Sequence, residues 1–127
     1  MITVKISELL NSVETLQKLS TKDFKAKLAW QIARLLKAAE AEIQSFNDTR
    51  IQLIRKYGEK GEDGQLITDE NGNCKIVENE VGNFNSELND LLNSIVEING
   101  NKIDIEQLED LDFTPSEMSI LEPFIEE

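Results

Sequence analysis

The chain has 127 residues, a formal net charge of −12, no histidine and one cysteine. Without histidine, serine–histidine and cysteine–histidine nucleophile systems are excluded, as is any zinc site that needs imidazole. One cysteine cannot form an internal disulfide or a thiolate metal site, and its lone occurrence fits a reducing compartment. The chain shows neither a signal-peptide pattern nor an apolar run of about 18 residues, so we expect no membrane association.

The charge is unevenly distributed along the chain. Residues 1–60 hold 11 Lys and Arg against 7 Asp and Glu, a net of +4, whereas residues 61–127 hold 2 against 18, a net of −16. Three interpretations stay open: the halves attract each other within one fold, the acidic half faces a basic partner, or the charge only keeps the protein soluble. An acidic surface repels nucleic acid, so we do not expect direct nucleic-acid binding.

The first part of the chain predicts a strand followed by two helices. Alternating apolar residues at 2–6 indicate a short strand, and helical spacing with Ser7 as N-cap indicates a helix over 8–19. With Thr21 as the next N-cap, a helix without Gly or Pro is predicted over 22–57, about 54 Å long. Its apolar stripe consists of Phe24, Leu28, Ile32, Leu35, Ala39, Ile43, Phe46, Leu53 and Tyr57, with Arg50 in register.

Short elements are predicted in the second half of the chain. After a glycine-rich loop at 58–64, Asn71-Gly72 predicts a hairpin between 65–68 and 74–77, and a helix follows over 83–94. Asn99-Gly100 predicts a second hairpin over 95–105. An acidic helical turn at 106–112 precedes a helix over 115–121, which a capping box from Thr114 to Glu117 opens. We expect Phe124 and Ile125 to dock, and we detect no internal repeat.

Together these elements predict one α+β domain over residues 1–127. A strand and a long helical hairpin form 1–57, a loop follows at 58–64, and 65–127 form an acidic mixed half. We expect small antiparallel β-hairpins and short C-terminal helices to pack against the C-terminal end of the helical hairpin. Because the long helix exceeds the diameter of a small domain, part of its stripe must cover another element or another chain, which leaves a homodimer open.

A calcium loop is the most specific metal site that the sequence suggests. Asp69, Asn71, Asn73 and Glu80 have the spacing of EF-hand ligands, but Cys74 stands where that loop needs its glycine. A hairpin turn explains the same residues, and we prefer it. The many close carboxylate pairs match no catalytic motif, so we expect a non-enzymatic protein without a cofactor, with a metal-dependent enzyme as the alternative.

Aromatic and apolar residues of the long helix are the candidate contacts for a partner. Trp30 lies two residues beyond Leu28 and off the stripe, where it either extends the core or anchors a partner; we prefer the core. Cys74 is interpreted as a structural or incidental residue rather than a reactive thiol. The candidate interaction residues are Trp30, Ile43, Phe46, Leu53, Tyr57 and Phe124.

The segments RIQLIRKYGEKGEDG and LDFTPSEMSILEPFIEE carry a resemblance. Across nearly the whole chain, the sequence resembles a family of small, acidic, uncharacterised proteins from tailed bacteriophages and prophages of Gram-positive and gut bacteria. Gly61 departs from that pattern, because such proteins often have an acidic residue there. The resemblance implies a phage origin, and therefore the bacterial host cytoplasm or the phage particle, and it carries over no catalytic residue.

The expected function is a phage-derived role through protein–protein interaction, with a host or a phage protein as the partner. Such a protein is either a virion or assembly accessory or an inhibitor of a host protein. The alternative is an acidic nucleic-acid mimic that blocks a DNA-binding host enzyme, with its carboxylates arrayed on one exposed face.

Overall fold

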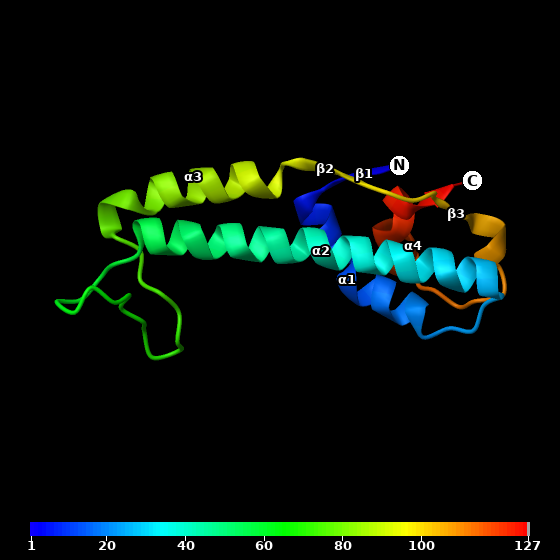
Figure 1. The fold of residues 1–127 in the computed structure, drawn as a ribbon, viewed down its shortest axis with the longest axis horizontal. Helices are drawn as coiled ribbons and strands as arrows, with labels where there is room; N and C mark the ends of the chain where they lie inside the picture. Colours follow the sequence, from blue (N-terminus) through cyan, green and yellow to red (C-terminus); the bar gives the residue numbers. More distant parts are fainter. Residues whose placement is uncertain (127) are drawn as a thin grey trace. The chain divides into compact units, whose positions relative to one another are not determined.

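The protein is an α+β fold that contains one long helix (Figure 1). A computed structural model describes residues 1–126. The elements are β1 (Ile2–Lys5), α1 (Ile6–Ser20), α2 (Ala26–Tyr57), the 3₁₀ turn η1 (Glu78–Glu80), α3 (Val81–Leu92), β2 (Ile95–Ile98), β3 (Ile103–Asp104), η2 (Ile105–Leu108), α4 (Pro115–Leu121), η3 (Glu122–Phe124) and β4 (Ile125–Glu126). The predicted long helical hairpin, antiparallel strand pairing and short C-terminal helices are confirmed.

The chain divides into two compact units that meet within α2. Unit 1 comprises Met1–Ile43 and the described residues from Ser94 onward, and unit 2 comprises Gln44–Asn93. The division therefore falls inside the long helix rather than at the predicted loop 58–64. That these units form one domain stays a prediction.

The strands of unit 1 pair with partners that are distant in the sequence. β1 pairs with β2 in antiparallel fashion, with Ile2 opposite Ile98, and β3 pairs with β4 in parallel, with Ile103 opposite Ile125. The predicted hairpin over 95–105 is therefore wrong, because the two strands that flank Asn99-Gly100 do not pair with each other. Pairing with the terminal strands leaves Ile2, Ile98 and Ile103 fully buried, and that burial outweighs the local turn preference.

The core of unit 1 joins the stripe of α2 to both ends of the chain. Leu28, Ile32, Leu35 and Ala39 are buried together with residues of β1, α1 and α4, and the ring of Phe124 is completely buried. The predicted docking of Phe124 is confirmed. The expectation that the short C-terminal elements pack on the C-terminal end of the long helix is wrong, because α4 packs on α1 and η3 on β1.

Two helix starts differ from the prediction for local reasons. The Glu8 carboxylate accepts a hydrogen bond from the backbone N–H of Lys5 at 3.1 Å, so α1 begins at Ile6. The Thr21 hydroxyl donates to the carbonyl of Lys18 at 2.7 Å, so Thr21 ends α1 instead of opening the next helix. As a result α2 begins at Ala26.

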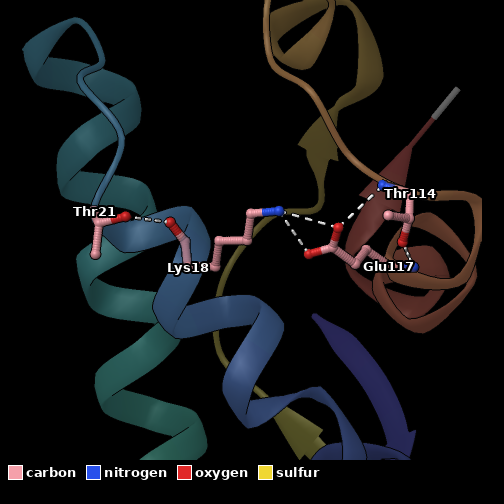
Figure 2. Close-up of polar contacts among 4 residues, drawn as sticks. All are labelled: Lys18, Thr21, Thr114 and Glu117. Atoms are coloured by element: carbon pink, nitrogen blue, oxygen red, sulfur yellow. Dashed lines mark hydrogen bonds and ion pairs between the residues drawn. The ribbon is translucent and has the colours of Figure 1, made fainter.

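An ion pair joins α1 to α4 in unit 1 (Figure 2). The Lys18 ammonium donates to both carboxylate oxygens of Glu117, at 3.0 and 2.9 Å. Glu117 also completes the predicted capping box, because its Oε1 accepts from the Thr114 N–H at 3.0 Å and its own N–H donates to the Thr114 hydroxyl at 3.1 Å. The Lys18 ammonium and the Thr114 N–H together lower the pKa of Glu117.

In unit 2, the end of α2 packs against α3. The Tyr57 and Phe84 rings meet edge to face at 6.3 Å, and the Lys56 ammonium lies 3.4 Å from a carboxylate oxygen of Glu87. The Tyr57 hydroxyl and then the Lys56 ammonium lower the pKa of Glu87. The other oxygen of Glu87 is shielded from solvent and has no hydrogen-bond partner among residues 1–126.

Residues 58–76 close a small backbone ring between α2 and α3. Three backbone hydrogen bonds form it. The N–H of Ile67 donates to the carbonyl of Glu59 at 2.8 Å, the N–H of Glu59 donates to the carbonyl of Lys75 at 2.7 Å, and the N–H of Lys75 donates to the carbonyl of Ile67 at 2.9 Å. The three residues stand eight positions apart, so each short extended segment bonds to the other two. Antiparallel bridges at Gly58–Ile76, Lys60–Leu66 and Thr68–Cys74 complete the ring and confirm the predicted hairpin around Asn71-Gly72.

The turns of this ring repeat with the same eight-residue period. Within the first two turns, the N–H of Gly61 donates to the carbonyl of Gln65 at 2.9 Å and the N–H of Asp69 donates to the carbonyl of Asn73 at 2.8 Å. At the third position the N–H of Val77 donates instead to the carbonyl of Tyr57 at 2.9 Å and joins the two ends of the ring. Each turn is tightened by a bond that spans three residues: Gly64 to Gly61, Gly72 to Asp69, and Glu80 to Val77. The backbone pattern therefore recurs three times although the sequence contains no internal repeat.

Gly58 allows the close approach that starts the ring, and its substitution provides a test. A Cβ at Gly58 would lie 2.5 Å from the carbonyl oxygen of Ile54 and 2.5 Å from the Leu66 side chain. We expect Gly58→Ala to destabilise unit 2 by about 1–3 kcal/mol in urea unfolding, the cost of an overpacked site. The matched change Gly82→Ala meets no atom within 4 Å and lies inside α3, so it should stabilise by up to about 1 kcal/mol. Equal effects at both glycines would contradict the close approach.

The Lys18–Glu117 pair predicts an acid-sensitive contribution to stability. Because the pKa of Glu117 is lowered below its unfolded value of about 4.3, the stabilisation is complete above that pH and is lost as the pH falls through the folded-state pKa. The difference in unfolding free energy between the wild type and Glu117→Gln should therefore be largest near pH 7 and should shrink below about pH 4.

Two further variants make this measurement specific. Lys18→Gln breaks the same pair from α1 and should reproduce the pH dependence of Glu117→Gln. Glu109→Gln alters an exposed carboxylate that forms no ion pair among residues 1–126, and it should stay near wild-type stability at pH 7. A difference for Glu117→Gln that does not change with pH would show that the pair contributes nothing.

Candidate interaction surface

Trp30 lies on the solvent side of α2, with 64% of its surface exposed. The preferred sequence interpretation, that it extends the core, is wrong. Two residues of helix separate Trp30 from Leu28, a rotation of about 200°, so the side chains point to nearly opposite sides. Since Leu28 belongs to the buried stripe, Trp30 must face outward.

Arg34 covers one face of the exposed indole. Its guanidinium carbon lies 4.8 Å from the Trp30 ring centroid, one helical turn further along α2. Spacing by four residues places the two side chains one above the other, and the guanidinium is attracted to the ring face. The stacked pair is thus ordered in advance, which lowers the entropy lost when a partner binds it.

A hollow of about 170 Å³ lies beside Trp30 in unit 1. It is enclosed by α2 and by the turn between β2 and β3, where the Gln31 side-chain amide donates to the carbonyls of Asn101 and Lys102 at 3.0 and 3.3 Å. Its lining residues are Lys27, Trp30, Gln31, Arg34, Leu35, Asn99, Gly100 and Asn101. The lining contains two cations and no carboxylate, in a chain with almost twice as many acidic as basic residues.

The cations around Trp30 are not neutralised by ion pairs. Within residues 1–126, the side-chain ion pairs are Lys18–Glu117, Lys56–Glu87 and Lys75–Glu59. None of these involves Lys27 or Arg34, the two cations that line the hollow. We call the surface formed by Trp30, the hollow, Lys27 and Arg34 the Trp30 face. Its lining carries two positive charges although the molecule carries −12.

The other predicted contact residues lie inside the units or are partly covered. Phe46 and Phe124 are buried, so their side chains are used within the fold. Ile43 is half-buried against the core of unit 1. Leu53 and Tyr57 are half-buried in unit 2, where the Tyr57 ring contacts Phe84.

The four residues with calcium-loop spacing take part in turns. The Asp69 carboxylate accepts hydrogen bonds from the N–H groups of Asn71 and Asn73, at 2.8 and 3.0 Å. Glu80 lies at the end of η1 and accepts from the Asn83 amide at 2.9 Å. No group of three or more metal-ligating side chains that could hold an ion occurs in the described part of the chain. Cys74 is a half-buried free thiol.

A larger hollow of about 500 Å³ lies elsewhere in unit 1. It is open, polar and apolar groups line it in similar measure, and Glu8, Lys102 and Glu122 are among its lining residues. It holds no aromatic side chain and no buried polar group that lacks a partner among residues 1–126, so it offers less for recognition than the Trp30 face.

Sequence reasoning missed the residues that complete the Trp30 face. Gln31 and Asn101 are 70 positions apart, and no local pattern connects them. Lys27 and Arg34, by contrast, follow from helix geometry, because they lie three and four residues from Trp30 and therefore on its side of the helix.

The chain matches no protein-family model, no curated protein and no solved structure. Among residues 1–126, no helix combines the length and the apolar character that crossing a membrane requires.

The local charge at Trp30, the sole tryptophan, can be measured by ionic quenching of its fluorescence. Iodide should quench more strongly than caesium, by about twofold or more, because the neighbouring cations attract anions despite the net charge. Lys27→Gln with Arg34→Gln should abolish this preference, whereas the control Arg50→Gln with Lys60→Gln, in unit 2, should keep it. Stronger quenching by caesium in the wild type would contradict a positive Trp30 face.

Proposed function

We propose that this chain is a non-enzymatic, phage-derived protein that acts by binding another protein through the Trp30 face. The observation that carries the proposal is a tryptophan with 64% of its surface exposed, stacked under Arg34 beside a hollow that no carboxylate lines. Tryptophan and arginine are the residue types most enriched at the energetic centres of interfaces. The fold does not use this pair for its own core.

The dimensions of the site favour a protein partner over a small molecule. Sites for small ligands usually enclose about 300–1,000 Å³. The hollow beside Trp30 encloses about 170 Å³, the scale of one amino-acid side chain. The net charge of −12 disfavours nucleic acid, whose backbone repels an acidic protein over most of its surface.

The biological setting rests on the sequence resemblance to phage and prophage proteins. Within that setting the candidate roles are a virion or assembly accessory and an inhibitor of a host protein. Both need a docking surface and neither needs a catalytic group.

A nucleic-acid mimic remains the second candidate because of one exposed acidic stretch. Glu106, Glu109, Asp110 and Asp112 are exposed, and none forms an ion pair among residues 1–126. A mimic would bind a basic DNA-processing protein through these carboxylates, and salt would weaken that binding strongly.

Tagged variants in a bacterial lysate distinguish the two candidates. Trp30→Ala should bind the captured partner at least about 30-fold more weakly and should therefore no longer retain it. This factor corresponds to about 2 kcal/mol, the typical cost of truncating a hot-spot residue. Ile95→Ala is the matched control, because Ile95 is 66% exposed in unit 1 but lies outside the Trp30 face, and it should keep the partner.

A third variant tests mimicry. If Glu106→Gln with Glu109→Gln and Asp110→Asn releases a partner that Trp30→Ala retains, the protein is a mimic and the proposed function is wrong. Capture that none of these variants changes would place the binding surface elsewhere.

A further inference from the structure

The acidic segment Asp104–Asp112 carries the negative charge that the Trp30 face lacks. It carries five acidic residues and no basic one, and its first turn is η2. None of its carboxylates forms an ion pair within residues 1–126. Ile105, which is 36% exposed, stands between Asp104 and Glu106 in the sequence and lines a shallow hollow with Met118 and Ile125. This segment thus presents an aliphatic side chain whose two sequence neighbours are acidic.

The two surfaces are complementary in charge and in apolar character. The Trp30 face has two cations without ion pairs, Lys27 and Arg34, and Asp104–Asp112 has five acidic side chains without them. The hollow beside Trp30 has the size of one side chain and a wall formed by the indole and Leu35. An exposed Ile flanked by carboxylates suits it, because the aliphatic group would leave water while the carboxylates would meet Lys27 and Arg34.

Within one copy these opposite charges do not pair. Both surfaces belong to unit 1, yet the ion pair that unit 1 forms among its described residues, Lys18–Glu117, uses neither Lys27 and Arg34 nor the segment. The attraction is therefore available to another molecule. Every copy carries both surfaces, so a symmetric pair would form the contact twice.

We propose that the Trp30 face binds the acidic segment Asp104–Asp112 of a second copy of this chain. The proposal rests on the proposed function and names its partner. The charge asymmetry of the sequence then guides self-assembly, and salt weakens the association because exposed charges are screened.

Sedimentation velocity of the purified full chain over a concentration series tests the proposal. At low salt the mass should rise with concentration beyond that of one chain, and the association should weaken at least about tenfold at 0.5 M salt. A wild type that stays monomeric at low salt overturns the proposal, and so does an association that salt does not weaken.

Charge reversal with rescue makes the test specific to the two surfaces. Lys27→Glu with Arg34→Glu should be monomeric, and so should Glu109→Lys with Asp110→Lys. An equimolar mixture of these two variants should associate again, because each restores the charge that the other has lost. Arg50→Glu with Lys60→Glu changes the net charge by the same amount as the first variant and should associate like the wild type.

Rescue that fails while circular dichroism shows both variants folded overturns the proposal. Trp30→Ala gives a second readout, since it should weaken self-association without altering net charge. A monomeric wild type whose Trp30-dependent capture of another protein persists would refute the second-copy partner and leave the proposed function standing. Loss of both would refute both.

Discussion

The structure depends on the continuous apolar stripe of α2. The helix runs for 32 residues without Gly or Pro, and its early stripe residues, Leu28 to Ala39, are buried in the core of unit 1. Its later part belongs to unit 2, where Phe46 is buried. A stripe of this kind covers one side of a helix, so the residues on the opposite side must face solvent or a partner. The exposure of Trp30 follows directly from the burial of its neighbours on the stripe.

Charge is used sparingly inside the fold. The Lys18–Glu117 pair joins the basic half of the sequence to the acidic half, which is the intramolecular attraction that the charge asymmetry suggests. Its carboxylate is only partly exposed and also caps α4, so one group makes both contacts. The remaining cations near Trp30 and the carboxylates of Asp104–Asp112 stay outside such contacts within residues 1–126. For most of these charges, therefore, the explanation must lie in solvation or in binding.

The parts of the fold that local chemistry determines could be predicted from the sequence. Helical spacing identified the stripe of α2, and the capping box at Thr114 identified the start of α4, because both signals lie within a few residues. Strand pairing failed because it is decided over long separations. Asn99-Gly100 satisfied every local rule for a hairpin, yet β2 and β3 pair with strands near the two ends of the chain. The site shows the same limit, since helix geometry places Lys27 and Arg34 beside Trp30 but cannot bring Asn101 to Gln31.

The backbone ring of residues 58–76, whose hydrogen bonds recur every eight residues, shows why some structural repeats escape sequence comparison. Its closing bonds join backbone groups of Glu59, Ile67 and Lys75, so side chains as different as an acid, an aliphatic chain and a base are equally compatible with it. Sequence is constrained where the backbone needs a left-handed conformation, and Gly64 and Gly72 supply it with φ of 77° and 82°. At the third turn Glu80 has a φ of −107°, and the chain continues into α3 instead. In the sequence, therefore, the repeat is visible only as two glycines eight residues apart. The geometry of the turns requires these glycines, but two glycines alone do not predict a ring.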